Sequence, residues 1–367
     1  MKDAFKDFGC FEGSKKWEQA IKRENPIYSR NDVRSEFERD YTRILHCQAY
    51  RRLKHKTQVF FAPHNDHVCT RMEHVMHVAS VAKTIAKYLG LNEQLAEAIA
   101  LGHDIGHAPF GHHGEDCLNG LMEQKEGMNA PKKFWHERNS LFFADYIETL
   151  PDPDAVEQPL NLTYAVRDGL VCHCGEIDQQ GIKPREDAID LYSIKRPGII
   201  QPFTWEGCVV KIADKIAYIN HDIDDAVRSG VISIDDVPKS SLELFGYSHR
   251  QRIDAMVNDV IENSEGKDEI MQSEEFRKEL LTLRSFMFKN VYKSSLVKKE
   301  EDLAKVGVVI KALYDYFLEH EEKLPEDLQE VARTEGINEA VKDFVAGMTD
   351  RYALSLYTDL FVPKAWK

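Results

Sequence analysis

Apolar residues recur at steps of three and four along most of the chain, and this spacing is the feature that most restricts its fold. One series runs from Val75 to Leu89 and stops before Gly90, and a longer one runs from Val209 to Ile223. Such spacing gathers the apolar side chains on one face of a helix. No comparable series of alternating apolar and polar residues indicates a sheet. The sequence therefore predicts an all-α fold.

Turn-forming and capping residues divide these helical stretches. Asn92 is well placed to cap a helix that runs into His103 and Asp104. After Gly230 the chain becomes more charged, and helical patterns continue over 249–263, 274–298, 301–322 and 336–347. Glycine and proline indicate a loop over 109–114, a surface excursion over 116–133, the end of a helix at Pro151 and a loop-rich segment over 175–200. A short hairpin near Thr57–Pro63 is also compatible with the pattern.

The densest group of titratable side chains lies between residues 103 and 115. It comprises His103, Asp104, His107, His112, His113 and Glu115. Imidazole and carboxylate groups suit divalent metals of intermediate hardness, such as manganese, iron, cobalt, nickel or zinc. His74 stands near the start of one expected helix, His103 and Asp104 at the end of the next, and Asp214 inside a later one. Three antiparallel helices could bring these side chains together in a bundle core.

Each of these residues also has a simpler interpretation when it is taken alone. A His-Asp dipeptide arises by chance, Asp214 could be a paired core carboxylate, and His74 could be a satisfied buried histidine. The concentration of groups that titrate near neutral pH favours a catalytic metal site instead. Cys172-His173-Cys174 fits no standard zinc spacing, and the seven cysteines include no CxxC pair and do not predict a disulfide framework.

Charge and composition exclude several classes of function. The formal net charge is −14, whereas a sequence-independent DNA binder usually carries a basic excess, so nucleic acid is a poor candidate for the main substrate. A small polyanionic substrate remains compatible if cations gather locally. No window approaches the ~18 apolar residues of a transmembrane helix, and the first residues do not form a signal peptide. We therefore expect a cytoplasmic protein without a membrane partner.

Seven segments, in order along the chain, resemble one enzyme family. The most specific are RRLKHKTQVF (51–60), GHDIGHAPFGHHGE (102–115) and KIADKIAYINHD (211–222). The chain closely resembles the dGTPase-like deoxynucleoside triphosphate triphosphohydrolases of the HD superfamily. The resemblance implies an HD-domain helical core with a C-terminal helical extension. We expect an N-terminal helical segment that contributes to the active site (1–69), an HD-domain core (70–230) and a C-terminal helical region (231–367).

The same resemblance implies roles for individual residues. The metal ligands would be His74, His103, Asp104 and Asp214. The catalytic residues would be His107, His112, Glu115 and His136. Phosphate would be bound by Arg71 and Lys215, and deoxyribose by Gln58, Tyr218 and Asp222. One departure is Glu137, because the family often has asparagine after this histidine. Core packing is the alternative for Tyr218, since partly buried tyrosines are common.

The implied reaction converts a dNTP, either dGTP or a broader set, and water into a deoxynucleoside and inorganic triphosphate, with attack at the α-phosphorus. One divalent metal ion per site is expected, manganese first, with magnesium, iron, cobalt, nickel or zinc as alternatives. His112, oriented by Glu115, is the first choice for the group that protonates the leaving oxygen, and His136 is the alternative. The family further implies a homo-oligomer, with a regulatory nucleotide at subunit contacts.

Other functions remain open from the sequence. A different HD phosphohydrolase could act on a nucleoside monophosphate, a cyclic nucleotide or an alarmone. A regulator could bind dNTPs without turnover. The basic run of Arg51, Arg52, Lys54 and Lys56 is equally compatible with a solvated helix face and with contacts to phosphate.

Overall fold

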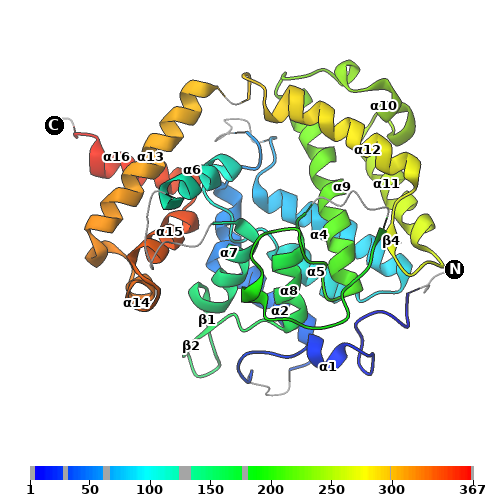
Figure 1. Ribbon diagram of the computed structural model, residues 1–367, viewed down its shortest axis with the longest axis horizontal. Helices are drawn as coiled ribbons and strands as arrows, with labels where there is room; N and C mark the ends of the chain where they lie inside the picture. The colour runs from blue at the N-terminus through cyan, green and yellow to red at the C-terminus, as the bar shows by residue number, and fades with distance from the viewer. Residues whose placement is uncertain are drawn as a thin grey trace.

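The computed structural model describes residues 5–27, 32–60, 67–123, 134–175, 181–297 and 299–364. Within these ranges helices make up nearly all of the regular structure, and the sheets are two pairs of very short strands (Figure 1). The predicted all-α fold is therefore confirmed. None of the helices in these ranges combines the length and apolar character needed to cross a lipid bilayer.

Three long helices form the centre of the molecule (Figure 1). They are α4 (Arg71–Leu89), α5 (Glu93–Gly102) and α9 (Trp205–Arg228). As predicted, α4 ends at Gly90, which takes the left-handed conformation with φ +76°. The side chain of Asn92 caps α5 by accepting hydrogen bonds from the backbone N–H groups of Gln94 and Leu95. The apolar face of α4 is fully buried against α5 and α9, so the periodicity of the sequence sets the packing.

Shorter elements surround this centre. α2 (Glu36–His46) and α8 (Tyr164–Cys172) pack against α5. The remaining elements of the N-terminal two thirds are α1 (Trp17–Ala20), α3 (Gln48–Arg52), η1 (Leu53–His55), α6 (Gly111–Glu123), α7 (His136–Phe142), η2 (Phe143–Ile147), β1 (Thr149–Pro151), β2 (Glu157–Pro159), β3 (Gly181–Ile182) and η3 (Leu191–Ser193). Strand β1 pairs with β2, and β3 pairs with the distant β4 (Ile270–Met271), both antiparallel.

The C-terminal helices divide between two hydrophobic cores. The first set extends the main core, and its elements are η4 (Ile234–Asp236), α10 (Lys239–Phe245), α11 (His249–Ser264), α12 (Glu274–Met287) and η5 (Phe288–Tyr292). The second set lies at the opposite side of Figure 1, and its elements are α13 (Glu300–Glu319), η6 (Glu321–Lys323), α14 (Glu326–Glu335), α15 (Ile337–Gly347) and α16 (Asp350–Phe361). These helices share a second core with α6.

Some local predictions from the sequence were wrong. Residues 111–123 form α6 instead of a loop and a surface excursion, because Leu118 and Met122 are buried in the second core. The helix expected over 274–298 ends in one π-helical turn at Tyr292. Pro151 ends a short strand and not a helix. Near the expected hairpin, Thr57 forms an isolated antiparallel bridge with Thr70, and residues 61–66 lie outside the described ranges.

Candidate active site and metal centre

Four of the predicted side chains converge at the centre of the three-helix arrangement. His74 comes from the first turn of α4, His103 and Asp104 directly follow α5, and Asp214 lies within α9. The Nε2 atoms of His74 and His103 are 3.3 Å apart, and His74 Nε2 lies 3.1 Å from Asp214 Oδ1. Asp104 Oδ2 lies 3.9 Å from His74 Nε2, and Asp104 Oδ1 lies 3.8 Å from His103 Nε2. All four side chains therefore direct donor atoms at one small region.

The surroundings of this cluster favour the protonation states in which its imidazoles and carboxylates can bind a cation. His103 Nδ1 contacts the carbonyl oxygen of Ala100 at 2.7 Å, which leaves Nε2 as the lone-pair nitrogen. Burial lowers the pKa of His74, so its imidazole stays neutral. Burial alone would raise the pKa of Asp214, but its hydrogen bond with His74 lowers it to about 2. Two imidazoles and two carboxylates in this arrangement fit a divalent metal ion.

Arg71 adds a fixed positive charge beside this cluster. Its Nη1 atom lies 2.5 Å from Asp104 Oδ2, and both side chains are almost fully buried. Although burial would raise the pKa of Asp104, the Arg71 guanidinium holds it well below its ordinary value. The guanidinium also lines the adjoining cavity, so it can contact an anionic ligand there.

A second group of histidines gathers around Glu115 at the start of α6. Glu115 Oε2 lies 3.1 Å from His136 Nδ1 and 3.7 Å from His112 Nδ1. The His107 ring stacks on His136 with centroids 4.1 Å apart. Burial would lower the pKa of His136, but the carboxylates of Glu137, Glu115 and Asp104 raise it to about 10. The histidines His112 and His136 thus share one carboxylate, and His112 has the more exposed side chain, at 68%.

A cavity of about 560 Å³ adjoins both groups, and it is lined by His74, Asp104 and Asp214 of the first and by His107, His112 and His136 of the second. Four of the residues expected to bind substrate line it, namely Gln58, Arg71, Tyr218 and Asp222. Gln58 Oε1 is buried and has no hydrogen-bond partner among the described residues, so it can accept a bond from a ligand. Lys215 follows Asp214 in α9 but is not among the side chains that line the cavity. Its contact with phosphate therefore stays a prediction.

Sequence reasoning missed one wall of this cavity. Arg284 of α12, with Phe288 and Tyr292 of η5 and the following Lys293, faces the histidines across the space. The Tyr292 hydroxyl donates a hydrogen bond of 2.6 Å to Asp222 Oδ2. The available signal was three basic and three aromatic residues within 284–293, and such a pattern also describes an ordinary amphipathic helix.

The second C-terminal set of helices contacts the segments around Thr57 and Phe110, which lie next to the cavity. The Asp350 carboxylate at the start of α16 accepts hydrogen bonds from the backbone N–H groups of Thr57 at 3.0 Å and Phe110 at 2.8 Å. The Lys56 ammonium is buried and donates to the carbonyl oxygens of His107 and Ala346.

The four members of the basic run, Arg51, Arg52, Lys54 and Lys56, have different surroundings. Lys56 has the backbone partners just described, and Arg52 pairs with Glu148. Arg51 and Lys54 are exposed.

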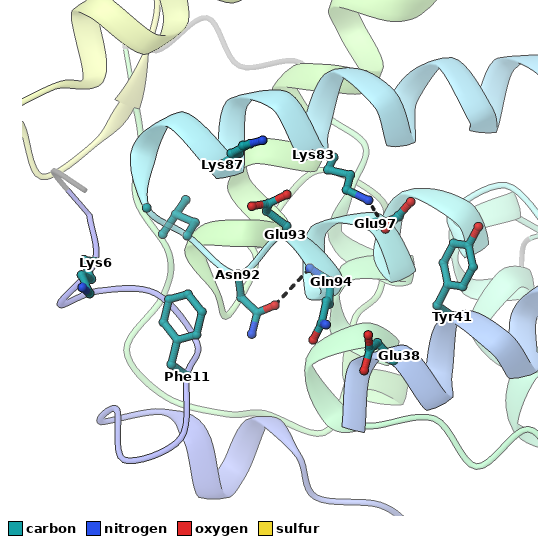
Figure 2. Close-up of a pocket in the computed structure, with 12 residues that line it drawn as sticks. Lys6, Phe11, Glu38, Tyr41, Lys83, Lys87, Asn92, Glu93, Gln94 and Glu97 are labelled. Atoms are coloured by element: carbon teal, nitrogen blue, oxygen red, sulfur yellow. Dashed lines mark hydrogen bonds and ion pairs between the residues drawn. The ribbon is translucent and has the colours of Figure 1, made fainter. Parts of the chain in front are cut away.

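A larger cavity, about 820 Å³, lies elsewhere, between the N-terminal segment and the ends of α4 and α5 (Figure 2). Its charged residues are of both signs and partly neutralise each other, as in the pair between Lys83 Nζ and Glu97 Oε2 at 2.9 Å. No histidine, cysteine or aspartate is among its lining residues. The smaller cavity, with its converging donors and perturbed pKa values, is the better candidate for the functional site.

Comparison with known proteins agrees with this geometry. The family described as HD domain matches residues 71–219, which contain the converging ligands, and the family described as phosphohydrolase-associated domain matches residues 270–359. Relatives that carry the name deoxyguanosinetriphosphate triphosphohydrolase-like protein include the following three. That of Caldanaerobacter subterraneus subsp. tengcongensis is 44% identical over 335 residues, covering 91% of this chain and 87% of the relative. That of Clostridium tetani is 41% identical, covering 92% and 88%, and that of Desulfatibacillum aliphaticivorans is 39% identical, covering 90% and 89%. The chain belongs to the HD-domain family of deoxyguanosinetriphosphate triphosphohydrolase-like proteins.

Proposed function

We propose that the protein hydrolyses deoxynucleoside triphosphates to deoxynucleosides and inorganic triphosphate. The observation that carries this proposal is the cluster of His74, His103 and Asp214, with Asp104 Oδ2 3.9 Å from His74 Nε2, beside a cavity that Arg71, His112 and Tyr218 also line. The cavity thus combines a cation site, a fixed positive charge and a proton donor, which are the groups that phosphoester hydrolysis needs. The names of the relatives support the choice of nucleotide, with dGTP as the first substrate to test.

In this proposal His74, His103, Asp104 and Asp214 hold one divalent metal ion, with manganese as the first choice. A bound cation there would supply Lewis-acid polarisation of phosphate and of the attacking water. Arg71 offsets charge that grows on the α-phosphate as water attacks. Lys215 is assigned to the same anionic group on the resemblance alone.

The leaving group is the O5′ alkoxide of the sugar, which has a high pKa and needs a proton as it departs. We assign this donation to His112, which is exposed to the cavity and lies 3.7 Å from the orienting carboxylate of Glu115. His136, whose pKa is raised to about 10 by Glu137, Glu115 and Asp104 against the effect of burial, stays a cation at neutral pH. It can therefore contact phosphate oxygens with the stacked His107 behind it.

We assign the selection of deoxyribose over ribose to the cavity wall that α9 forms. Tyr218 and Asp222 lie four residues apart on α9 and both line the cavity. The Tyr218 ring would leave no room for a 2′-hydroxyl group, while Asp222 and Gln58 would accept from the 3′-hydroxyl group. A homo-oligomer with a regulatory nucleotide at subunit contacts, and a cytoplasmic location, complete the proposal and rest on the family resemblance.

Product analysis tests the proposal. Manganese-loaded protein is incubated with each of the four dNTPs, singly and mixed, and the products are separated by chromatography. Triphosphate and deoxynucleoside in equal amounts are expected. Orthophosphate or pyrophosphate as the sole product would instead indicate another HD phosphohydrolase, and tight binding without any product would indicate a nucleotide-sensing regulator.

A further inference from the structure

A second cluster of possible metal ligands lies beside the first. It consists of His136, Glu137, His173 and Cys174, and one donor atom from each lies within 4.8 Å of all the others. His136 Nε2 lies 3.7 Å from Cys174 Sγ and 3.5 Å from Glu137 Oε1. Donors bound to tetrahedral zinc through bonds of ~2.1–2.3 Å stand ~3.4–3.8 Å apart. The two measured contacts already match a shared cation.

Both histidines are oriented as metal ligands usually are. His173 Nδ1 contacts the carbonyl oxygen of Leu170 at 2.8 Å, and His136 Nδ1 lies 3.1 Å from Glu115 Oε2. Such outer hydrogen bonds fix the ring and the tautomer, and they leave Nε2 as the coordinating atom. Burial lowers the pKa of His173 to about 3, so this imidazole is neutral.

Glu137 supplies an independent indication of a missing partner. Its side chain is 3% exposed, and its Oε2 atom has no hydrogen-bond partner among the described residues. A buried carboxylate oxygen without a partner is costly. The other carboxylate oxygen of Glu137, Oε1, lies 3.5 Å from His136 Nε2. Lys211 of α9 is buried in the field of Cys174 and Glu137 but forms no ion pair with Glu137 in the described ranges.

The structure also explains why the Cys172-His173-Cys174 run alone does not predict a site. Cys172 Sγ lies in a different direction and donates to Asp168 Oδ1 at 3.6 Å. Only His173 and Cys174 belong to the cluster, and the other two donors come from α7, far away in the sequence. Cys174 and both histidines line the cavity, so the cluster is open to ions from solvent.

We propose that His136, Glu137, His173 and Cys174 bind a second divalent cation of the zinc type next to Asp104. Asp104 stands between the two clusters, with Oδ1 at 4.0 Å from His136 Nε2 and Oδ2 at 3.9 Å from His74 Nε2. A thiolate among the donors selects zinc, cobalt or cadmium over magnesium and manganese. On binding, the metal replaces the proton of the Cys174 thiol, which passes to solvent.

This second site has a consequence that rests on the proposed function. With a cation on Nε2, His136 is a neutral ligand and no longer a charged contact for phosphate. Zinc in the second site therefore slows hydrolysis by the manganese-loaded enzyme.

Cobalt(II) absorption tests the site without any use of turnover. A thiolate ligand gives cobalt a charge-transfer band in the near ultraviolet, whereas the ligands of the first cluster contain no sulfur. Titration of metal-free wild type is expected to give two bound cobalt ions per chain and the band. Cys174→Ser is expected to bind one ion without the band, while Cys172→Ser, two residues away, behaves as wild type. Wild type without the band, or an undiminished band in Cys174→Ser, would overturn the proposal.

A second variant and an inhibition assay complete the test. Glu137→Gln keeps the sulfur ligand, so the band is expected to persist with cobalt affinity lowered at least tenfold. Zinc should inhibit manganese-loaded wild type and Cys172→Ser at concentrations at least tenfold lower than Cys174→Ser. Equal zinc sensitivity of the three proteins would overturn the inhibitory role. A protein that shows the cobalt band but releases no triphosphate from any dNTP would contradict the proposed function and leave the second site standing.

Discussion

The Tyr292 hydroxyl group donates a hydrogen bond of 2.6 Å to Oδ2 of Asp222, and this contact joins the C-terminal helices to the core at the cavity wall. Asp222 Oδ1 lies 3.0 Å from His221 Nδ1, and His221 Nε2 lies 3.0 Å from His74 Nδ1. Two hydrogen-bond contacts, Tyr292–Asp222 and His221–His74, therefore lie next to each other between η5 and a proposed metal ligand, and the His221 Nδ1–Asp222 Oδ1 approach between them lacks hydrogen-bond geometry. The segment after residue 231 shapes the site as well as covering the core.

Replacement of Tyr292 by phenylalanine tests this connection. The variant leaves a buried carboxylate oxygen without its donor, which typically costs about 1.5–3 kcal/mol when the partner is charged. We expect a lower melting temperature and an increase in KM for dNTPs of about tenfold, equivalent to 1.4 kcal/mol of binding. Steady-state kinetics and calorimetry measure both. If KM and melting temperature both equal those of wild type, the contact does not hold Asp222 in place.

Asp104→Ala is expected to abolish manganese binding and hydrolysis together. The variant removes two donor oxygens and leaves the buried Arg71 guanidinium without its counter-charge. Metal content by mass spectrometry and triphosphate release measure the two effects. Asp315→Ala removes an exposed carboxylate on α13 and serves as the control. Unchanged turnover in Asp104→Ala would show that the active site is not where we place it.

Glu115→Gln tests the shared carboxylate. Together with Glu137 and Asp104, Glu115 raises the pKa of His136 to about 10 against the effect of burial. Removal of its charge lowers that pKa, so His136 loses its proton at lower pH, and the alkaline limb of the kcat profile should move to lower pH. Because His112 also loses its orienting partner, we expect kcat at neutral pH to fall by a factor of about 10² or more. If the alkaline limb of the kcat profile does not shift, the positive charge on His136 has no role in the reaction.

Much of the fold and the convergence of the four proposed ligands could be predicted because the signals are local. Gly90 and Asn92 delimit two helices through their own backbone and side-chain bonds, and the apolar periodicity fixes which faces meet. Once three helices are placed antiparallel, His74, His103, Asp104 and Asp214 have little choice but to converge. The convergence of these side chains therefore follows from helix positions that short stretches of sequence determine.

The remaining parts depend on contacts between distant segments. Tyr292 reaches Asp222 across 70 positions, and Lys56 reaches the carbonyl oxygen of Ala346 across 290. The continuation of α6 to Glu123 depends on Leu118 being buried beneath the helices after residue 300. No local pattern encodes which polar helix face will be turned towards a cavity, so the wall formed by α12 and η5 was not foreseen.

Asp343 gives a prediction about stability and pH. Burial raises its pKa from 3.8 to about 6, although the adjacent Lys342 ammonium opposes this shift. The folded protein therefore holds this proton more tightly than the unfolded chain does. The resulting stabilisation is complete below pH 3.8 and is lost as the pH rises through 6, and it amounts to about 3 kcal/mol. Between pH 4 and pH 7 the free energy of unfolding of wild type should fall by about 2 kcal/mol more than that of Asp343→Asn in denaturant unfolding. Parallel profiles of the two proteins would contradict this prediction.

Gly106→Ala probes the turn that carries the histidines and Asp104. An added Cβ atom would lie 2.1 Å from the backbone nitrogen of Ser140 and 2.4 Å from the carbonyl carbon of Asn139. Backbone atoms cannot rotate away, so α7 must move from the turn, and the bond from the Gly106 N–H group to Ser140 Oγ at 2.9 Å must lengthen.

We expect Gly106→Ala to lose about 2 kcal/mol or more in stability and to bind manganese more weakly, because overpacking shifts the backbone that positions His103 and Asp104. Gly120→Ala is the matched control, since nothing lies within 4 Å of its added Cβ in α6. There the gain in helix propensity should stabilise the protein by about 0.5–1 kcal/mol. Urea unfolding and manganese titration of both variants decide the matter: a Gly106→Ala protein as stable as Gly120→Ala would mean that the turn and α7 are not in the contact described.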